Sequence, residues 1–273
     1  MKAAFIPPIP HLNDFGDGDF HLVLSNLLDN PTYMSHYERQ RERGAWILLD
    51  NSAHEDGQGA DPEKLIYQAL HLNAQEVVVP DVLDDADATL ESSVNALEIW
   101  NNLGLKEQIS HLRFMYVPQG EDYRSLVYCF DNLIKAHIYN ARQQRNRLGF
   151  SIGISKDYET FDGGLMRFLD EEVAPMHRAF QKNGIDVEVH MLGWGRDLWA
   201  LNEIAKKHTF LRSTDSAKPF VYAHSDILLD QPWNPPAYPG RPEDYFNVTL
   251  TEEQVRIAQI NSDVFTALAA GEL

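Results

Sequence analysis

Thr-Phe-Leu-Arg-Ser-Thr-Asp-Ser-Ala-Lys-Pro-Phe, at residues 209–220, is the stretch from which the fold can be interpreted. It starts as a short apolar strand, ends that strand with Asp215, and continues with small residues and Pro219. Trp-Ile-Leu-Leu-Asp-Asn-Ser at 46–52 has the same arrangement, with Asp50 at the end of an apolar strand. Barrels and open parallel sheets present reacting groups at the carboxyl ends of their strands. The two aspartates therefore indicate chemistry by a pair of carboxylates.

Eight short apolar segments are predicted to be strands, and helices are predicted between most of them. The strand candidates span 3–7, 21–26, 46–51, 76–81, 112–118, 148–154, 187–192 and 209–214. The helix candidates span 31–43, 61–72, 86–103, 122–141, 163–183 and 196–207. This alternation predicts the α/β class and, at this chain length, an irregular TIM-like (β/α)8 barrel.

The chain is expected to form a single domain over residues 1–273. With 44% hydrophobic residues it can bury one large core, and no repeat or domain boundary is evident. Two features depart from an ideal barrel, since no helix is expected between the first two strands and none directly after the last. Within residues 231–273, a Pro-rich loop and a helix over 251–269 are expected to pack on the barrel and supply the missing eighth helix.

Charge and cysteine content exclude several classes of protein. The 23 basic and 41 acidic residues give a net charge of −18, which disfavours nucleic-acid binding unless cations cluster locally. The single cysteine, Cys129, excludes an internal disulfide and a Cys-rich zinc subdomain. The start of the chain does not resemble a signal peptide, and no apolar run reaches transmembrane length. We expect a soluble cytoplasmic protein with no membrane partner.

Polar residues and glycines gather at the predicted strand ends. They are Asp50, Asn51, Asp81, Gln119, Gly120, Gly153, Ser155, Gly193, Trp194 and Asp215. The glycines would let a flat ligand approach the backbone closely. An aspartate after a strand often only caps the next helix, and Asp84 and Asp85 compete with Asp81 for that role. His190, inside a strand, is expected to be a hydrogen-bonded core histidine, and the Glu-Asp-Gly at 55–57 a turn.

No metal site is predicted. His11, His21, His36 and His54 lack ligand spacing, and no His-x-x-x-His lies on a predicted helix.

The order of these motifs resembles the queuine/archaeosine tRNA-guanine transglycosylase superfamily, most of all its short DNA-acting branch in phages and bacteria. Leu-Leu-Asp-Asn-Ser-Ala-His (48–54) is similar to the family's Asp-Ser-Gly-Gly-aromatic turn, and Val-Pro-Asp (79–81) to its base-reading aspartate. Tyr-Val-Pro-Gln-Gly (116–120) resembles Val-Gln-Gly, and His-Met-Leu-Gly (190–193) resembles Leu-Met-Gly. Ser-Thr-Asp-Ser-Ala (213–217) resembles the segment that holds the family's nucleophile.

The resemblance implies a role for each matching residue. Asp215 would be the nucleophile and Asp50 the general acid/base. The base-binding residues would be Asp81, Gln119, Gly120, Asn51, Gly153, Gly193, His54 and Leu192, with His54 and Leu192 sandwiching the base. No cofactor is implied, since a free 7-deazaguanine is itself a substrate. Two departures matter: Ser52-Ala53 replace the Gly-Gly of the turn, and the zinc subdomain of the tRNA enzymes is missing, which favours DNA.

The expected function is exchange of guanine in DNA for a free 7-deazaguanine through a covalent aspartyl-nucleotide intermediate. The candidate phosphate contacts are Arg124, Lys156, Arg196 and Lys218. The alternative interpretation of each is a solvated cation on the surface. Weak, salt-sensitive binding is expected, with a partner protein as a possible aid, in the host cytoplasm if the gene is phage-borne. Three alternatives stay open: a tRNA-guanine transglycosylase, a glycoside hydrolase that uses Asp50 and Asp215, and a non-catalytic binding subunit.

Overall fold

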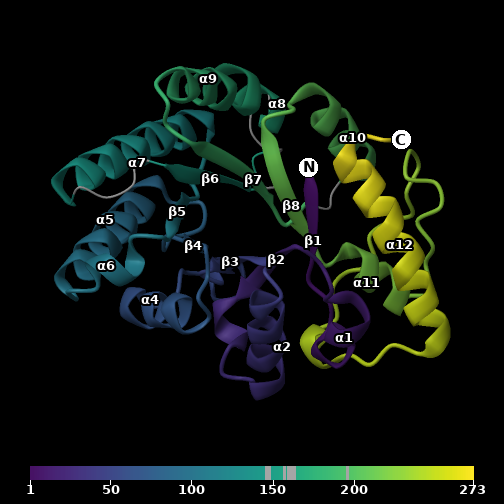
Figure 1. The fold of residues 1–273 in the computed structure, drawn as a ribbon. Helices are drawn as coiled ribbons and strands as arrows, with labels where there is room; N and C mark the ends of the chain where they lie inside the picture. Colours follow the sequence, from purple (N-terminus) through teal and green to yellow (C-terminus); the bar gives the residue numbers. More distant parts are fainter. Residues whose placement is uncertain (145–148, 156–157, 159–163, 195–196) are drawn as a thin grey trace.

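Eight parallel strands form a nearly closed barrel in the computed structural model, which describes residues 1–144, 149–155, 158, 164–194 and 197–273 (Figure 1). The strands are β1 (Lys2–Phe5), β2 (Phe20–Leu24), β3 (Trp46–Asp50), β4 (Glu76–Val78), β5 (Arg113–Tyr116), β6 (Phe150–Ser155), β7 (Val187–Leu192) and β8 (Leu211–Ser216). Their order is β1-β8-β7-β6-β5-β4-β3-β2, and β1 lies beside β2. The prediction of an irregular (β/α)8 barrel is confirmed.

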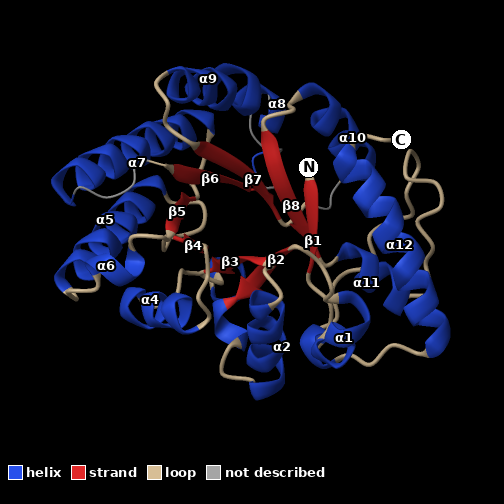
Figure 2. Ribbon diagram, in the orientation of Figure 1, coloured by secondary structure: helices blue, strands red, loops and turns tan. Residues whose placement is uncertain are grey.

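Helices enclose the strands as an outer ring (Figure 2). They include α2 (Pro31–Glu42), α4 (Pro62–His71), α5 (Ala86–Asn102), α7 (Tyr123–Gln144), α8 (Gly164–Phe168), α9 (Ala174–Lys182) and α10 (Leu198–Lys207), all near their predicted positions. Side-chain caps begin four of them: Asn30, Asp61, Asp85 and Asp197 each accept a backbone N–H of the first turn. These caps satisfy amide groups that have no partner within the helix.

A π-helical turn, Leu169–Val173, joins α8 to α9. The helix predicted over 163–183 is therefore two α-helices with a π turn between them, and residue 163 lies outside the described residues.

The two departures from an ideal barrel are smaller than the sequence suggested. A short helix, α1 (Leu12–Phe15), lies between β1 and β2. The expectation that no helix directly follows the last strand is wrong, because α11 (Lys218–His224) begins two residues after β8. Pro219 occupies its first turn, where proline is favoured and does not break a helix. Two further short helices, α3 (Ala53–Asp56) and α6 (Lys106–Ile109), were not predicted.

The C-terminal helix α12 (Glu252–Ala270) closes the outer layer over β1. It begins with a capping box between Thr251 and Gln254 and packs against α10, α11 and β1 (Figure 1). Phe265 is fully buried, and its ring meets Phe5 of β1 at 6.1 Å between centroids. The terminal amino group of Met1 donates to the Ala269 carbonyl at 2.8 Å, so both ends of the chain are joined here.

The barrel interior is apolar in its middle and closed by charged groups at the amino ends of the strands. Leu22, Leu48, Val78 and Met115 fill the middle. Below them, Glu76 is fully buried and pairs with Arg212, Nη1 to Oε2, at 2.7 Å. Because this end is filled, the opposite end, where the strands terminate, is where a ligand can enter.

The contact between α12 and β1 leads to a first prediction. Phe265→Ala removes a fully buried ring and should lower the free energy of unfolding by about 3–5 kcal/mol. Thr266→Ala, at the exposed neighbouring position, should change it by less than about 0.5 kcal/mol. Urea denaturation followed by circular dichroism measures both. Equal stability of the two variants would show that α12 does not stabilise the barrel.

Candidate active site

A cavity of about 600 Å³ opens at the carboxyl ends of the strands. This volume lies in the usual range for pockets that bind small molecules. All eight strands contribute a residue from their ends or from the loop just beyond: Ile6, Leu24, Asp50, Asp81, Gln119, Ser155, Leu192 and Asp215. The two aspartates from which the sequence analysis began, 165 positions apart, therefore line one cavity.

Asp215 is held by two donors on one of its carboxylate oxygens. Oδ1 accepts the backbone N–H of Gly193 at 3.0 Å and lies 3.0 Å from Nε2 of His190. Gly193 has a φ of +58°, a left-handed conformation that glycine adopts without steric cost. The side chain of Asp215 is almost fully buried. Among the described residues both donors bind Oδ1, which leaves Oδ2 for a reacting atom.

His190 connects Asp215 to a line of polar groups inside the barrel. Its Nδ1 lies 2.8 Å from Ser213 Oγ, and Arg212 Nε donates to the same hydroxyl at 3.1 Å. Arginine can only donate, so Ser213 Oγ accepts from Arg212 and can donate its own hydrogen to Nδ1. A neutral ring that accepts at Nδ1 carries its proton on Nε2, which then donates to Asp215. The line continues from Arg212 to Glu76, so it runs from the closed end of the barrel to the cavity.

The sequence interpretation of His190 was incomplete. The histidine is buried and hydrogen-bonded, as expected, but one of its partners is the candidate nucleophile. The β7–β8 register shifts between Val189 and His190, and such bulges redirect the side chains next to them. No spacing in the sequence reveals this shift.

Asp50 ends β3 and is positioned by the turn that follows it. Its Oδ2 accepts the backbone N–H of Ser52 at 3.0 Å. Ser52 has a φ of +59°, the conformation that a glycine of the resembled turn would adopt readily. Its hydroxyl lies 3.0 Å from Ser25 Oγ and also bonds Asn26, and these contacts hold the unfavourable backbone in place.

The electrostatic surroundings of Asp50 favour its protonated form. Burial raises the pKa of Asp50 well above its ordinary value, and the negative charges of Glu55, Asp215 and Asp81 raise it further. The hydrogen bond from Ser52 opposes this shift without cancelling it. A carboxyl group that keeps its proton near neutral pH is suited to act as a general acid.

Asp81 is clamped between two side-chain amides. Asn51 Nδ2 donates to Oδ1 and Gln119 Nε2 donates to Oδ2, both at 2.6 Å. Burial raises the pKa of Asp81 to about 6, although both hydrogen bonds oppose the shift. The N-cap of α5 is Asp85, so Asp81 does not serve as a helix cap. The clamp fixes the carboxylate plane while Asp81 still lines the cavity.

Most of the other predicted base-binding residues line the cavity, and two glycines do not. His54, Leu192, Gly193, Asn51 and Gln119 line the cavity. The amide of Asn51 is occupied by Val79, Asp81 and Ala53, so this residue orients Asp81.

Two predicted base-binding glycines do not line the cavity. A Cβ on Gly153 would meet Val117 and Leu192 within 3 Å, so Gly153 lies below those side chains, and Ser155 lines the cavity in its place. Gly120 packs against the first turn of α7, where a Cβ would lie 2.5 Å from the Leu126 amide nitrogen. Both glycines serve packing, which a strand-end position alone cannot distinguish from ligand contact.

The predicted phosphate contacts have different outcomes. Lys218 lines the cavity and is buried, so the alternative interpretation, a solvated cation on the surface, is wrong for this residue. Arg124 is exposed on α7 and does not line the cavity. Lys156 and Arg196 lie outside the described residues.

The sequence analysis gave no role to many of the cavity residues, among them Glu55, Trp194, Tyr238 and Arg241. Glu55 belongs to α3 rather than to a simple turn. Tyr238 and Arg241 come from the Pro-rich segment, which carries no periodicity or motif that would assign it to the mouth of a barrel. Trp194 was noted at its strand end but given no role.

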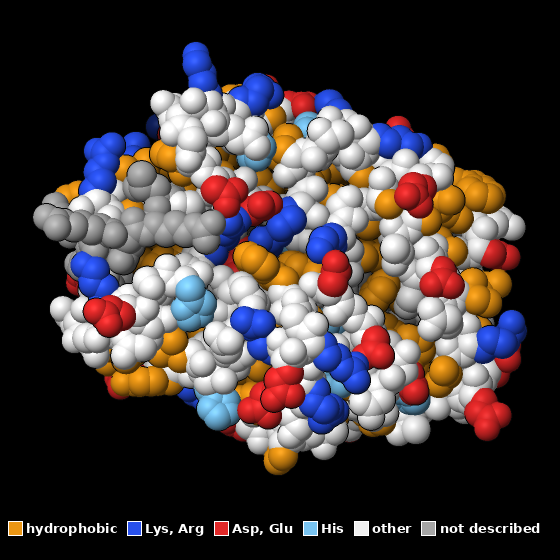
Figure 3. Space-filling model, in the orientation of Figure 1, with side chains coloured by type: hydrophobic (Ala, Val, Ile, Leu, Met, Phe, Trp, Pro, Cys, Tyr) orange, Lys and Arg blue, Asp and Glu red, His pale blue; other side chains and the backbone are white. Residues whose placement is uncertain are grey.

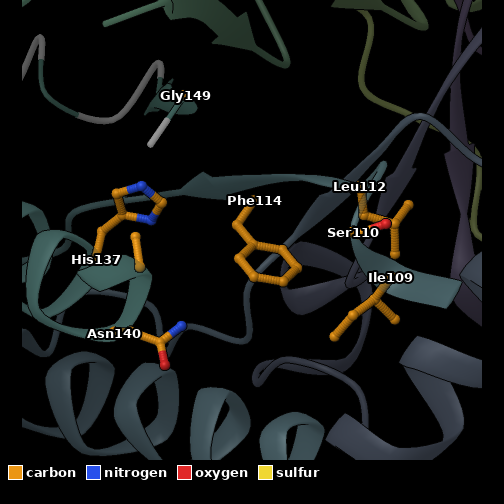
Figure 4. A pocket seen from close by; sticks show the side chains of 8 residues that line it. Ile109, Ser110, Leu112, Phe114, His137, Asn140 and Gly149 are labelled. Atoms are coloured by element: carbon orange, nitrogen blue, oxygen red, sulfur yellow. The ribbon is translucent and has the colours of Figure 1, made fainter. Parts of the chain in front are cut away.

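A second hollow lies near the amino ends of β5 and β6. Ile109, Ser110, Leu112, Phe114, His137, Asn140, Ala141 and Gly149 line it (Figure 4). Its volume of about 10 Å³ is close to that of a single water probe, so it has no room for a base or a sugar. The cavity at the carboxyl ends of the strands is therefore the candidate site.

Within the described ranges, no group of three or more His, Cys, Asp or Glu side chains is placed to hold a metal ion. No helix in that same part of the chain is long and apolar enough to cross a membrane. No protein-family model matches the chain, and no curated protein matches it.

The burial of Asp81 leads to a prediction about stability. Because the folded protein holds this proton more tightly than the unfolded chain does, Asp81 destabilises the fold increasingly from about pH 4 to about pH 6, and by a constant amount above. A shift of about two pKa units corresponds to about 3 kcal/mol.

Urea denaturation across this pH range should show the effect against Asp81→Asn, which does not titrate. The wild-type free energy of unfolding minus that of the variant should fall by about 3 kcal/mol between about pH 4 and about pH 6 and then stay level. A flat difference for Asp81→Asn would contradict the raised pKa.

Proposed function

We propose that this protein exchanges guanine in DNA for a free 7-deazaguanine, with Asp215 as nucleophile and Asp50 as general acid/base. The observation that carries the proposal is the meeting of Asp50, Asp81 and Asp215 in one cavity of about 600 Å³, each with different partners. The motif resemblance gives the substrate class, and the contacts of each carboxylate support its role.

The first half of the reaction breaks the glycosidic bond. Oδ2 of Asp215 attacks C1′ of the target nucleotide, and the electron pair of the C1′–N9 bond moves to the departing guanine. Asp50 gives its proton to that base. The hydrogen bonds from His190 and Gly193 to Oδ1 fix the plane of Asp215, so that the nucleophile needs little reorientation.

The second half restores the glycosidic bond with a different base. The incoming 7-deazaguanine gives a ring proton to the Asp50 carboxylate, and the nitrogen so freed attacks C1′. The C1′–Oδ2 bond breaks and its electron pair returns to Asp215. Atoms and charges balance without a cofactor, because one base replaces another.

Asp81 suits recognition of a guanine-like edge. Adjacent N–H groups of such a base can donate to its carboxylate oxygens, whose other hydrogen bonds come from Asn51 and Gln119. Leu192 and His54 also line the cavity, in agreement with the proposed sandwich of the base. A nucleotide within a duplex would have to rotate out of the stack to reach the cavity.

Nucleophile removal gives the central test. Asp215→Ala should lower the rate at which labelled guanine enters DNA by more than about a thousandfold, because no covalent intermediate can form. Asp263→Asn, exposed on α12, should exchange at the wild-type rate. The assay compares duplex DNA, single-stranded DNA and tRNA. A wild-type rate for Asp215→Ala would refute the role of Asp215, and label entering tRNA alone would assign the exchange to tRNA.

The contact from His190 gives a second test. His190→Phe removes a donor to the nucleophile and should lower kcat about ten- to a hundredfold, with the KM for free guanine unchanged. His190→Gln, which keeps an N–H donor, should recover part of the loss. If both variants lost activity equally, with a changed melting temperature, the effect would come from packing rather than from positioning of Asp215.

A further inference from the structure

The described part of the cavity wall carries two cations beside four acidic side chains. Among its described lining residues, the acidic side chains are Asp50, Glu55, Asp81 and Asp215, and the Lys and Arg side chains are Lys218 and Arg241. On the face of the molecule drawn in Figure 3, by comparison, Lys and Arg side chains are interspersed with Asp and Glu. A cation pair at the cavity of a protein with net charge −18 needs a specific explanation.

Lys218 lies in the cavity wall, three residues beyond the candidate nucleophile. Only 6% of the residue is exposed, which is rare for lysine. Its Nζ lies 5.8 Å from the ring centre of Tyr222 and 5.5 Å from that of Tyr238. The faces of these rings attract the ammonium group and orient it.

Arg241 is brought to the cavity by the Pro-rich segment and is held on several sides. Its Nη1 pairs with Glu55 Oε1 at 3.2 Å, and the guanidinium lies over Tyr245 and Phe246 at 5.9 and 5.6 Å. A guanidinium has five N–H donors. It can therefore bind a second anion while Glu55 holds it, in the planar geometry that suits phosphate.

The topology of the barrel gives the direction in which a bound nucleotide would lie. In a ring of eight strands in this order, β4 stands opposite β8, so Asp81 and Asp215 face each other across the mouth. If C1′ is next to Asp215 and the base edge next to Asp81, the sugar and its phosphates extend toward the β8 side. Lys218 begins α11 two residues after β8, and its Nζ lies 5.5 Å from the ring of Tyr238. Arg241 follows Tyr238 by three residues in the same segment and also lines the cavity.

We propose that Lys218 and Arg241 form a phosphodiester-binding subsite, which holds a phosphate of the DNA strand next to the nucleotide under attack. The proposal rests on the proposed function for the orientation of the nucleotide. It assigns the Pro-rich segment, through Tyr238 and Arg241, to nucleic-acid binding. It also accounts for DNA binding by an acidic protein, because two local cations at the cavity contact the backbone.

Binding of a fluorescent single-stranded DNA oligonucleotide with one guanine, followed by anisotropy between about 50 and 200 mM salt, tests the subsite. Arg241→Ala should weaken binding about tenfold and reduce the slope of log affinity against log salt by about 0.7, the value for one lost contact to a single strand. Lys218→Met, which keeps the apolar stem, should do the same. Arg241→Lys should keep the wild-type slope, because the charge is retained.

Arg178→Ala, an exposed arginine on α9 away from the cavity, is the matched control and should bind as the wild type does. Melting temperatures of all variants establish that they are folded. If folded Arg241→Ala and Lys218→Met bound with wild-type affinity and salt slope, the subsite would be refuted. The subsite would also be refuted if Arg241→Ala and Lys218→Met weakened binding no more than Arg178→Ala does.

Exchange kinetics on the same proteins separate this inference from the proposed function. In Arg241→Ala, the KM for DNA should rise while the KM for free guanine stays unchanged. Exchange by this variant at the wild-type KM for DNA would overturn the subsite and leave the exchange reaction standing. Conversely, if the wild type incorporates no label but loses DNA binding through Arg241→Ala and Lys218→Met, the subsite stands and the exchange reaction falls.

Discussion

The hydrogen bond between His190 Nε2 and Asp215 Oδ1 is the contact on which the site depends. A carboxylate buried at the end of a barrel strand is costly unless its oxygens are satisfied. Here the imidazole and the Gly193 amide satisfy one oxygen, and no other described residue occupies the second. Behind His190, Ser213 and Arg212 fix the direction in which the ring donates, and Glu76 neutralises the arginine inside the barrel. The cavity end and the closed end of the barrel are thus joined by one line of hydrogen-bonded polar groups.

Three carboxyl groups of one cavity are made different by their neighbours. Asp50 has one backbone donor and several nearby negative charges, and burial with these charges raises its pKa well above the ordinary value. Asp81 is less accessible to solvent than Asp50, but two amides hold it, and its pKa rises only to about 6. Asp215 receives a histidine and a backbone amide on the same oxygen. Similar groups in different surroundings can take different chemical roles, as the proposed base exchange requires of these three.

The C-terminal part of the chain both completes the barrel and extends its mouth. Helix α12 covers β1 and packs on α10 and α11, where an eighth helix would stand. The Pro-rich segment before it passes the cavity and contributes Tyr238 and Arg241 to the wall. Tyr222 of α11 donates its hydroxyl to the Pro236 carbonyl at 2.9 Å, which ties this segment to the barrel. A segment that reads as an irregular linker therefore belongs to the candidate site.

The sequence alone determined the fold class, the positions of the eight strands and most of the helices, because buried parallel strands are nearly continuous apolar runs and their helices carry side-chain caps. It also placed Asp50, Asp81, Gln119 and Asp215 at strand ends, and the strand ends of a barrel converge on one mouth. Only the tertiary structure decided what those residues touch. His190 depends on a register shift between β7 and β8, Arg241 on a crossing segment without periodicity, and Gly153 on its depth below Leu192. These are contacts between residues distant in the chain, and local sequence pattern carries no information about such distances.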